Sequence, residues 1–378
     1  MNSTRREIEL SGGVLSVHVE ESDWSLDDLC GFASRNNPKR RFLFVSKVLG
    51  KHIPARPSTM ARAYRDLSDK IRQIGLQGPT VCIALCETAT GLGEGVWEAM
   101  VRGGSEAVFL HSTRTTFDSP LAFRFEEAHS HAVDHLLYRP QGLAEQEAFD
   151  RAGTLVLVDD EISTGKTMRE IARAFLAHDP ALRRVVVVTL TDWVDQAAWD
   201  ALWKGFPIEV ARTSLLRGSF SFTPTPGFVA SQVAPAEACG PATVSLPIRG
   251  PRFGITAPSE VPSAWLEDFT HPHSETILVL GTGEFHHVPF LFARALEAKG
   301  FDVRYQSSTR SPILPGHAIE SVLTFRDHHG EGIPNFLYNA LPAQYDRVLA
   351  CYEVVGDLPA THGLPAILGA QQLRLGPA

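Results

Sequence analysis

The sequence predicts an α/β protein, because short apolar runs alternate along the chain with segments of helical periodicity. The runs rich in valine, isoleucine and leucine are 80–86, 107–111, 155–158, 184–189 and 277–280. Such runs are typical of strands buried on both faces of a parallel sheet. Apolar residues at helical spacing follow several of them, as in 168–177, and this alternation favours βαβ units.

Size and composition restrict the class of protein further. The chain has 378 residues, enough for two domains, and its net charge of −8 argues against a nucleic-acid surface. It has no window of eighteen apolar residues, and MNSTRREIEL lacks the apolar core of a signal peptide. The five cysteines form no CxxC pair, which is typical of free thiols in a reducing compartment. We therefore expect a cytoplasmic protein without a membrane or nucleic-acid partner.

The N-terminal part predicts a small elaboration before the main sheet. Residues 1–25 alternate apolar and polar residues, which indicates a hairpin or edge strand. Ser25 is a candidate helix cap, and a strand is expected over 42–45. The spacing then predicts a helix over 58–74 with Ser58 as its cap.

The most informative stretch is LVLVDDEISTGKT, residues 155–167. An apolar strand is followed by Asp159 and Asp160 and then by a small, hydroxyl-rich loop that leads into a helix. Ligands of open α/β sheets bind beyond the carboxyl ends of the strands, and a helix N-terminus binds phosphate. Adjacent carboxylates beside a phosphate suit a ribose diol, directly or through a Mg²⁺ shell. The sequence argues against a P-loop, because Asp160 stands where its first glycine is needed and the loop is too short.

A second candidate turn follows the strand 80–86. It reads ETATGLGEG, and a glycine-rich turn lets backbone amides approach an anion closely.

The run 155–167 resembles the diphosphosugar-binding motif of type I phosphoribosyltransferases. The resemblance implies a parallel sheet of that type flanked by helices, with an N-terminal hood. It implies that Asp159 and Asp160 hold the ribose hydroxyls of phosphoribosyl diphosphate and Mg²⁺, directly or through water. The loop implied to bind the 5′-phosphate consists of Ser163, Thr164, Gly165, Lys166 and Thr167.

The same resemblance assigns roles to three further segments. Arg114 is expected to contact the pyrophosphate, with Arg124 as a second candidate, because the family closes a loop over its site here. Lys47, Lys51 and His52 lie where the hood meets substrate, although a solvated basic loop is equally compatible. The loop implied to bind pyrophosphate consists of Glu87, Thr88, Ala89, Thr90 and Gly91.

Two sets of residues keep several interpretations. His131 and His135, four residues apart and near Glu127, suit a metal, a substrate contact or a solvated helix. Phe220 and Phe222 suit either stacking on an acceptor base or core packing, whereas Trp199 and Trp203 favour the core.

Composition changes over 223–262, where proline, glycine and alanine dominate, and this predicts a linker. We expect a first domain over 1–240 and a smaller second α/β domain over 241–378. The second domain begins with a strand over 277–280, a helix over 288–299 and a strand over 302–306. A dinucleotide fingerprint is excluded because His286 replaces its last glycine.

Thr309–Pro312 spell TRSP, and Gly281–Phe285 and Gly332–Asn339 also resemble the TRSP domain, which follows one branch of phosphoribosyltransferases. That architecture implies a role in bacterial tellurite-resistance and stress-response clusters that build a nucleoside-like metabolite. The residues expected to form an anion site in this domain are Gly281, Thr282, Gly283, Thr309, Arg310 and Ser311. The histidine pairs 286–287 and 328–329 are a weaker metal candidate.

The sequence therefore predicts a Mg²⁺-dependent phosphoribosyltransferase. It would transfer ribose 5-phosphate from phosphoribosyl diphosphate to an unknown small acceptor and release pyrophosphate. Purine-using relatives carry an acid where this chain has Ser163, so a purine acceptor is in doubt. A regulator that binds without turnover and a bifunctional enzyme are the alternatives, and a homodimer stays open.

Overall fold

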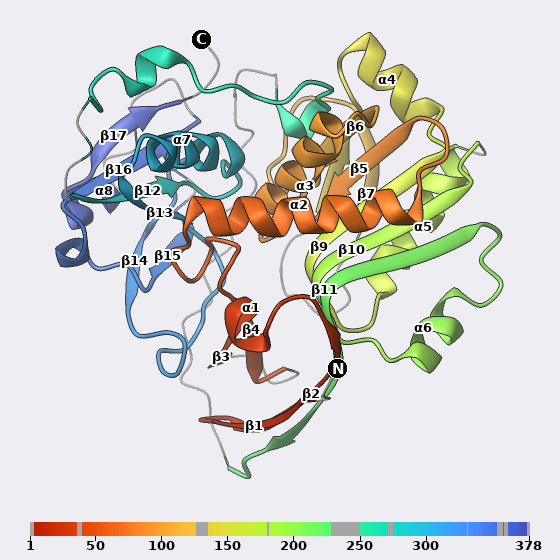
Figure 1. Cartoon of the computed structure of the whole chain (residues 1–378), viewed down its shortest axis with the longest axis horizontal. Coiled ribbons are helices and arrows are strands. Elements are labelled where there is room, and N and C mark those ends of the chain that lie inside the picture. Colours follow the sequence, from red (N-terminus) through yellow and green to blue (C-terminus); the bar gives the residue numbers. More distant parts are fainter. Residues whose placement is uncertain are drawn as a thin grey trace.

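The computed structural model describes residues 4–35, 40–125, 135–179, 181–227, 250–270, 272, 275–330, 332–353, 358 and 362–375. It contains a mostly parallel seven-stranded sheet and a smaller parallel sheet, both flanked by helices, which confirms the predicted α/β class (Figure 1). The expected domain boundary near 240 lies outside the described residues.

The larger sheet has seven strands in the order β1-β2-β11-β10-β9-β5-β6. The five strands from β11 to β6 are parallel, and the β1–β2 hairpin extends the sheet antiparallel to β11. The strands are β1 Thr4–Leu10, β2 Gly13–Ser22, β5 Thr80–Ala84, β6 Ala107–His111, β9 Thr154–Ile162, β10 Arg184–Asp192 and β11 Glu209–Pro224.

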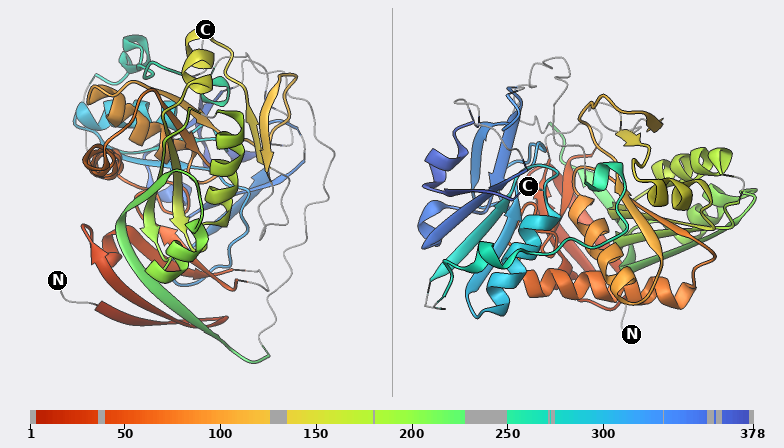
Figure 2. Two further views of the ribbon diagram at one scale, coloured as in Figure 1. Left: turned by 90° about the vertical axis from the view of Figure 1, so that its right-hand side faces the viewer. Right: turned by 90° about the horizontal axis from the view of Figure 1, so that it is seen from above.

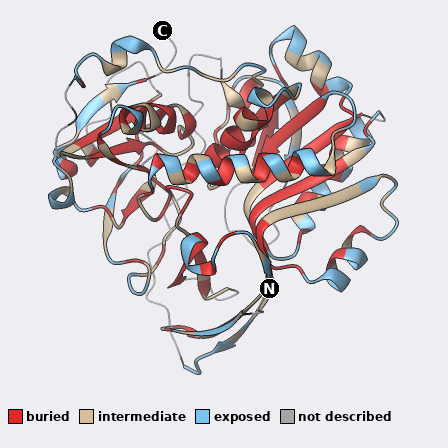
Figure 3. Ribbon diagram, in the orientation of Figure 1, coloured by how far each residue is buried: buried red, intermediate tan, exposed pale blue. Residues whose placement is uncertain are grey.

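Successive side chains along these strands point to opposite faces of the sheet, and the side chains on both faces are apolar, which explains why helices cover both faces. In β9, Leu155 and Leu157 pack with α4, α5 and α6, whereas Val156 and Val158 pack with α2 and α3. Figure 3 shows the resulting buried strands and the striped, amphipathic surface of α2. The helices are α1 Leu26–Leu29, α2 Pro57–Ile74, α3 Thr90–Arg102, α4 Leu143–Asp150, α5 Lys166–His178, α6 Gln196–Trp203, α7 His287–Ala298 and α8 Leu364–Leu368. Among the described residues, none of the helices is both long and apolar enough to span a membrane.

One local prediction needs correction. Ser58 does not cap α2: Arg56 is the N-cap residue, and the Ser58 hydroxyl donates to Glu297 instead. Phe220 and Phe222 lie on β11, which continues past a bulge at Arg217 and Gly218 and pairs with β2.

Two small hairpins lie at the edges of the first domain. The hood hairpin joins β3 Cys30–Ser34 to β4 Phe42–Ser46, and a second hairpin joins β7 Leu121–Phe125 to β8 His135–Tyr138. The second hairpin lies near Arg114 and contains Arg124, in the region where the resemblance implies a loop that closes over the site. Residues 126–134, which include Glu127 and His131, lie outside the described residues.

The smaller sheet is parallel, with four strands in the order β13-β12-β16-β17. Its elements are β12 Thr276–Gly281, β13 Asp302–Ser307, β16 Arg347–Tyr352, β17 Gln371–Arg374, the hairpin β14 Val322–Arg326 and β15 Pro334–Tyr338, and the 3₁₀ turns Pro251–Phe253, Ser263–Leu266 and Pro342–Gln344. Gly300, with φ of +95°, follows the C-cap residue Lys299 of α7.

The two sheets share one apolar core. Helix α2 runs along both of them, and Figure 2 shows it from two further sides. Tyr64 of α2 contacts Phe290 of α7, with ring centroids 5.3 Å apart, and both belong to a continuous buried cluster that includes residues of either sheet. Ala33 and Val45 of the hood pack in turn against Phe336 and Tyr338 of β15. The second domain is therefore packed against the first over a broad interface.

Candidate active site

The carboxylate pair lies at the carboxyl end of β9, in the middle of the parallel sheet. The register pairs Val158 with Ala84 of β5 and Asp159 with Thr189 of β10. Asp159 and Asp160 are both half-buried, and an Asp159 oxygen accepts the Asp160 backbone N–H at 2.9 Å. Adjacent parallel strands thus place the pair beside the segment that follows β5.

A third acid, Glu161, shapes the field around this pair. Burial, followed by the Glu161 carboxylate, raises the pKa of Asp160 to about 6. Glu161 itself forms an ion pair with Arg40, which lies 4.9 Å over the Phe42 ring of the hood. This contact ties the hood to the carboxylate strand.

The expected phosphate loop connects β9 to α5. Ser163, Thr164 and Lys166 are exposed, and Gly165 is the N-cap residue of α5, where no side chain caps the helix. Gly165 has φ of +72°, a conformation that favours glycine. The first-turn amides of a thirteen-residue helix are thus left for an anion.

The expected pyrophosphate loop, 87–91, connects β5 to α3. Thr88 is half-buried, Ala89 and Gly91 are buried, and Thr90 Oγ1 donates to the Glu87 carbonyl at 3.2 Å. This loop lies one strand away from the carboxylate pair, because β5 and β9 are neighbours. Both loops therefore lie at the same edge of the sheet.

Arg114 follows β6, next to this loop. Its guanidinium is 3.4 Å from Nε2 of His135, while His135 Nδ1 is 3.4 Å from the Cys86 sulfur. Burial, together with Glu284, raises the pKa of the Cys86 thiol to about 12. Arg124 is exposed on β7.

Lys51 is buried and does not lie in a solvated loop. Its side chain is 1% exposed, and Nζ donates to Glu87 Oε1 at 3.2 Å and to the carbonyls of Gly283 and Ser308 at 2.8 and 2.9 Å. Lys51 therefore connects the expected pyrophosphate loop to the second domain. His52 is buried next to it, and Lys47 donates to the Asp27 carbonyl.

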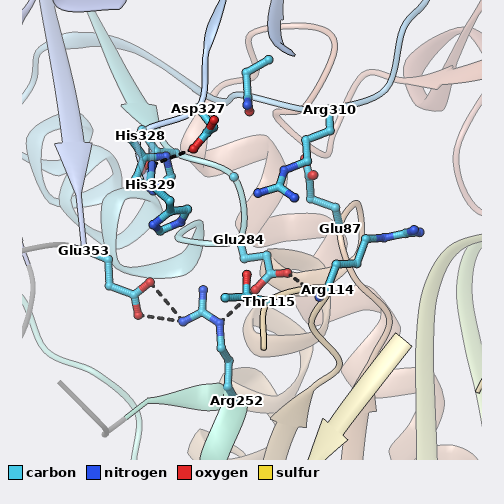
Figure 4. A pocket seen from close by; sticks show the side chains of 13 residues that line it. Glu87, Arg114, Thr115, Arg252, Glu284, Arg310, Asp327, His328, His329 and Glu353 are labelled. Carbon is cyan, nitrogen blue, oxygen red and sulfur yellow. Dashed lines mark hydrogen bonds and ion pairs between the residues drawn. The ribbon is translucent and has the colours of Figure 1, made fainter. Parts of the chain in front are cut away.

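Part of the anion site expected in the second domain lies in an interdomain pocket, drawn in Figure 4. Among the predicted residues, Thr282, Gly283 and Arg310 line the pocket together with Glu87 and Arg114 of the first domain. Gly281, Thr309 and Ser311 are not among its lining residues. The Gly283 amide donates to Ser308 Oγ at 3.0 Å, so this N–H already has an acceptor within the protein.

The histidine pairs lie in different places. His286 and His287 pack at the start of α7, where His287 bonds Glu98 of α3 at 3.0 Å. His328 and His329 line the interdomain pocket instead. Within the described residues, no group of three or more His, Cys, Asp or Glu is arranged to hold a metal ion.

The aromatic candidates belong to packed clusters. Trp199 and Trp203 are buried in the core, as predicted. Phe220 lies 5.1 Å and Phe222 4.9 Å from Phe42 of the hood, which favours their packing role.

The sequence did not indicate a role for three charged residues of the pocket, Arg252, Glu284 and Glu353. Arg252 is 7% exposed and lies in the segment predicted as a linker, and it donates to Glu284 and Glu353. Glu284 also accepts from Thr113 at 2.7 Å. The only signal in the sequence was an arginine enclosed by two glycines and a proline, in RGPRFG.

Residues 29–219 match the family model described as phosphoribosyl transferase, which covers half of the chain. The chain therefore belongs to the phosphoribosyltransferase family. Residues 249–368 match the TRSP domain that follows this type of transferase, so the protein has the fused architecture.

Solved structures with a similar fold include adenine phosphoribosyltransferase from Trypanosoma brucei, at 13% identity and a TM-score of 0.37, covering 52% of this chain and 82% of that one. A hypoxanthine-guanine phosphoribosyltransferase from Bacillus anthracis shares 14% identity at a TM-score of 0.25, covering 44% and 83%. A Neisseria gonorrhoeae protein with bound ppGpp shares 13% sequence identity at a TM-score of 0.27. The match covers 44% of this chain and 85% of that one. A search of the curated proteins found no match.

Proposed function

We propose that the protein transfers the 5-phosphoribosyl group from phosphoribosyl diphosphate to a small acceptor and releases pyrophosphate. The single observation that carries this proposal is the arrangement at one sheet edge. A carboxylate pair lies there between an uncapped helix N-terminus at Gly165 and the turn 87–91. The family membership gives the reaction class, and the residue roles are our proposal.

Each part has a task that its chemistry suits. The α5 amides and the hydroxyls of Ser163 and Thr164 would hold the 5′-phosphate. Asp159 and Asp160 would accept hydrogen bonds from the ribose hydroxyls and fix the ring. The amides of 87–91, apart from that of Ala89, which donates to the Leu85 carbonyl, would stabilise charge that develops on the departing pyrophosphate. Positioning of this kind lowers the barrier.

Mg²⁺ suits this set of groups. It binds proteins through one or two carboxylates and completes its shell with water and substrate phosphates. Asp159 and Asp160 offer two adjacent carboxylates, so a protein cage of three ligands is not needed. When bound, the metal would neutralise charge on the diphosphate.

The acceptor and the pathway are proposed more broadly. We propose an acceptor other than a standard purine, because Ser163 replaces the acid expected for purine contact. We further propose a place in the biosynthesis of a nucleoside-like metabolite, in keeping with the TRSP fusion. A regulator that binds phosphoribosyl diphosphate without turnover would use the same site. An assay of pyrophosphate release distinguishes the two functions, because only an enzyme releases pyrophosphate.

The test is calorimetric titration of the full chain with phosphoribosyl diphosphate, with and without Mg²⁺. We expect Mg²⁺-dependent binding that falls at least tenfold in Asp159→Asn/Asp160→Asn. The paired control is Asp195→Asn/Asp200→Asn, which removes two charges from α6 and its cap and should leave binding unchanged. Absence of binding to the wild type, or equal binding by the double variant, would refute the site.

A further inference from the structure

The interdomain pocket lies where the carboxyl ends of both parallel sheets meet. Glu87 and Thr115 follow β5 and β6 of the first sheet, whereas Glu284, Arg310 and Glu353 follow β12, β13 and β16 of the second. Open α/β sheets bind ligands at this end of their strands. Two such ends facing one cavity favour a site shared by both domains.

A buried arginine in this pocket has hydrogen-bonding capacity left over. Arg252 Nε donates to Glu284 at 2.9 Å, and Nη1 donates to Glu353 at 2.8 and 3.0 Å. Nη2 has no hydrogen-bond partner among the described residues, and Figure 4 shows the guanidinium directed into the cavity. Because Arg252 is 7% exposed and its guanidinium faces the cavity, this nitrogen can donate to an acceptor that a ligand brings.

Further donors face the same space. The Arg310 side chain extends into the cavity from the wall opposite Arg252. His328 and His329 line a further side of the cavity (Figure 4). Burial, and after it charged neighbours that include Arg310 and Arg252, lowers the pKa of both histidines. An anion among these groups would relieve that unfavourable positive field.

The carboxylates of the pocket are already engaged. Glu284 accepts from Thr113 and Arg252, and Glu87 accepts from Lys51. Asp327 accepts the backbone N–H groups of His329 and Ile333 at 2.9 and 2.7 Å. With these acids occupied, a ligand that brings acceptors fits the pocket better than a cation.

The size of the cavity limits the ligand. Its volume is about 20 Å³, against roughly 10–15 Å³ required for a single water molecule. The cavity therefore suits one small group at most, and neither a nucleobase nor a whole diphosphate fits in it. Arginine guanidinium groups bind phosphate oxygens strongly and with defined geometry.

We propose that this pocket is a second phosphate-binding site, built by both domains and centred on Arg252 and Arg310. It takes one phosphate group, either the 5′-phosphate of the phosphoribosylated product or one end of the pyrophosphate released over the first sheet. The choice between these sources rests on the proposed function, whereas the site itself does not.

The experiment uses the full chain carrying Ser163→Glu, whose added carboxylate repels anions from the exposed 163–167 loop. Inorganic phosphate is titrated into this protein and into the same protein with Arg310→Gln or His329→Gln added. We expect saturable binding that weakens at least tenfold with Arg310→Gln and measurably with His329→Gln. Arg347→Gln, at the opposite end of β16, is the matched control and should leave binding unchanged. Tungstate, a heavy analogue of phosphate, should be located by anomalous diffraction between Arg252 and Arg310.

Two results would overturn the proposal: loss of all phosphate binding in Ser163→Glu alone, or unchanged affinity after Arg310→Gln. Titration with pyrophosphate and with ribose 5-phosphate distinguishes the sources, because the true ligand should bind more tightly than inorganic phosphate. Asp159→Asn/Asp160→Asn should keep this phosphate site while losing phosphoribosyl diphosphate. Failure of the proposed function and failure of the shared site are therefore separate outcomes.

Discussion

At the scale of single residues, the interface between the domains depends on buried charges. Glu98 of α3 accepts from His287 and Arg294 of α7 at 3.0 and 3.1 Å. Burial opposes its ionisation, but these partners lower the pKa of Glu98 to about 2. Glu94, one turn earlier, is 4% exposed, and its Oε1 has no hydrogen-bond partner among the described residues. Two acids on one helix face thus behave in opposite ways.

Glu94→Gln is expected to change the pH dependence of stability. Burial first, and then the Glu98 and Glu353 carboxylates, raises the pKa of Glu94 from 4.5 to about 7, although His287 and Arg252 lower it. A raised carboxyl pKa means that the fold prefers the protonated acid. The stability from this preference is fully present below pH 4.5 and is lost as pH rises through about 7.

The loss corresponds to roughly 3 kcal/mol, from about 1.4 kcal/mol per pKa unit. Glu94→Gln should therefore be about as stable as the wild type at pH 5 and up to this amount more stable at pH 8. Urea unfolding at both pH values measures it, with the exposed Glu147→Gln as the control. An equal difference at both pH values would contradict the assignment.

At the scale of elements, the start of α3 packs closely against His286 of the second domain. A Cβ atom added at Gly91 would lie 1.9 Å from Nδ1 of His286. His286 is held there because its Nε2 bonds the Leu49 carbonyl at 3.2 Å and its ring lies 4.9 Å from Tyr305. The glycine-rich sequence 91–95, which suggested an anion-binding turn, thus also serves close packing between domains.

Gly91→Ala is expected to destabilise the protein by about 1–3 kcal/mol, because overpacking a rigid site has that cost. In a His286→Ala background the same change should cost much less, since the ring that it meets is absent. A double-mutant cycle of urea unfolding measures the coupling. Gly250→Ala, where an added Cβ meets nothing within 4 Å, is the control. An additive cycle would show that the two residues do not meet.

At the scale of the whole molecule, the two domains share one buried core. Their largest apolar cluster includes Val158 of the first sheet and Val279 of the second, together with residues of α2, α3 and α7. The buried Lys51 and the Arg252 ion pairs cross the same interface. Isolating either domain would expose apolar surface and leave buried charges unpaired.

The full chain should therefore unfold in one cooperative transition. Hydrogen exchange followed by mass spectrometry in rising urea measures this for peptides from β10 and β16. Both are expected to open at the same denaturant concentration. A second-domain peptide that opens well before β10 would show that the domains are energetically independent.

The sequence by itself determined the local elements and the motif of the first domain. The period of apolar residues predicted the strands and helices around 155–167, because local sequence governs burial of a central parallel strand. It also predicted the carboxylate pair with the loop 163–167, which are contiguous in sequence, and the turn 87–91, which follows the neighbouring strand β5.

Only the tertiary structure decided how the second domain contributes. Arg252, Glu284 and Lys51 are far apart in sequence, and each looked like part of a turn or linker. Their partners come from other elements, so no periodicity within a single segment could indicate the ion pairs. The shared pocket exists because two separate parallel sheets direct their carboxyl ends toward one another, and that is a property of packing between distant parts of the chain.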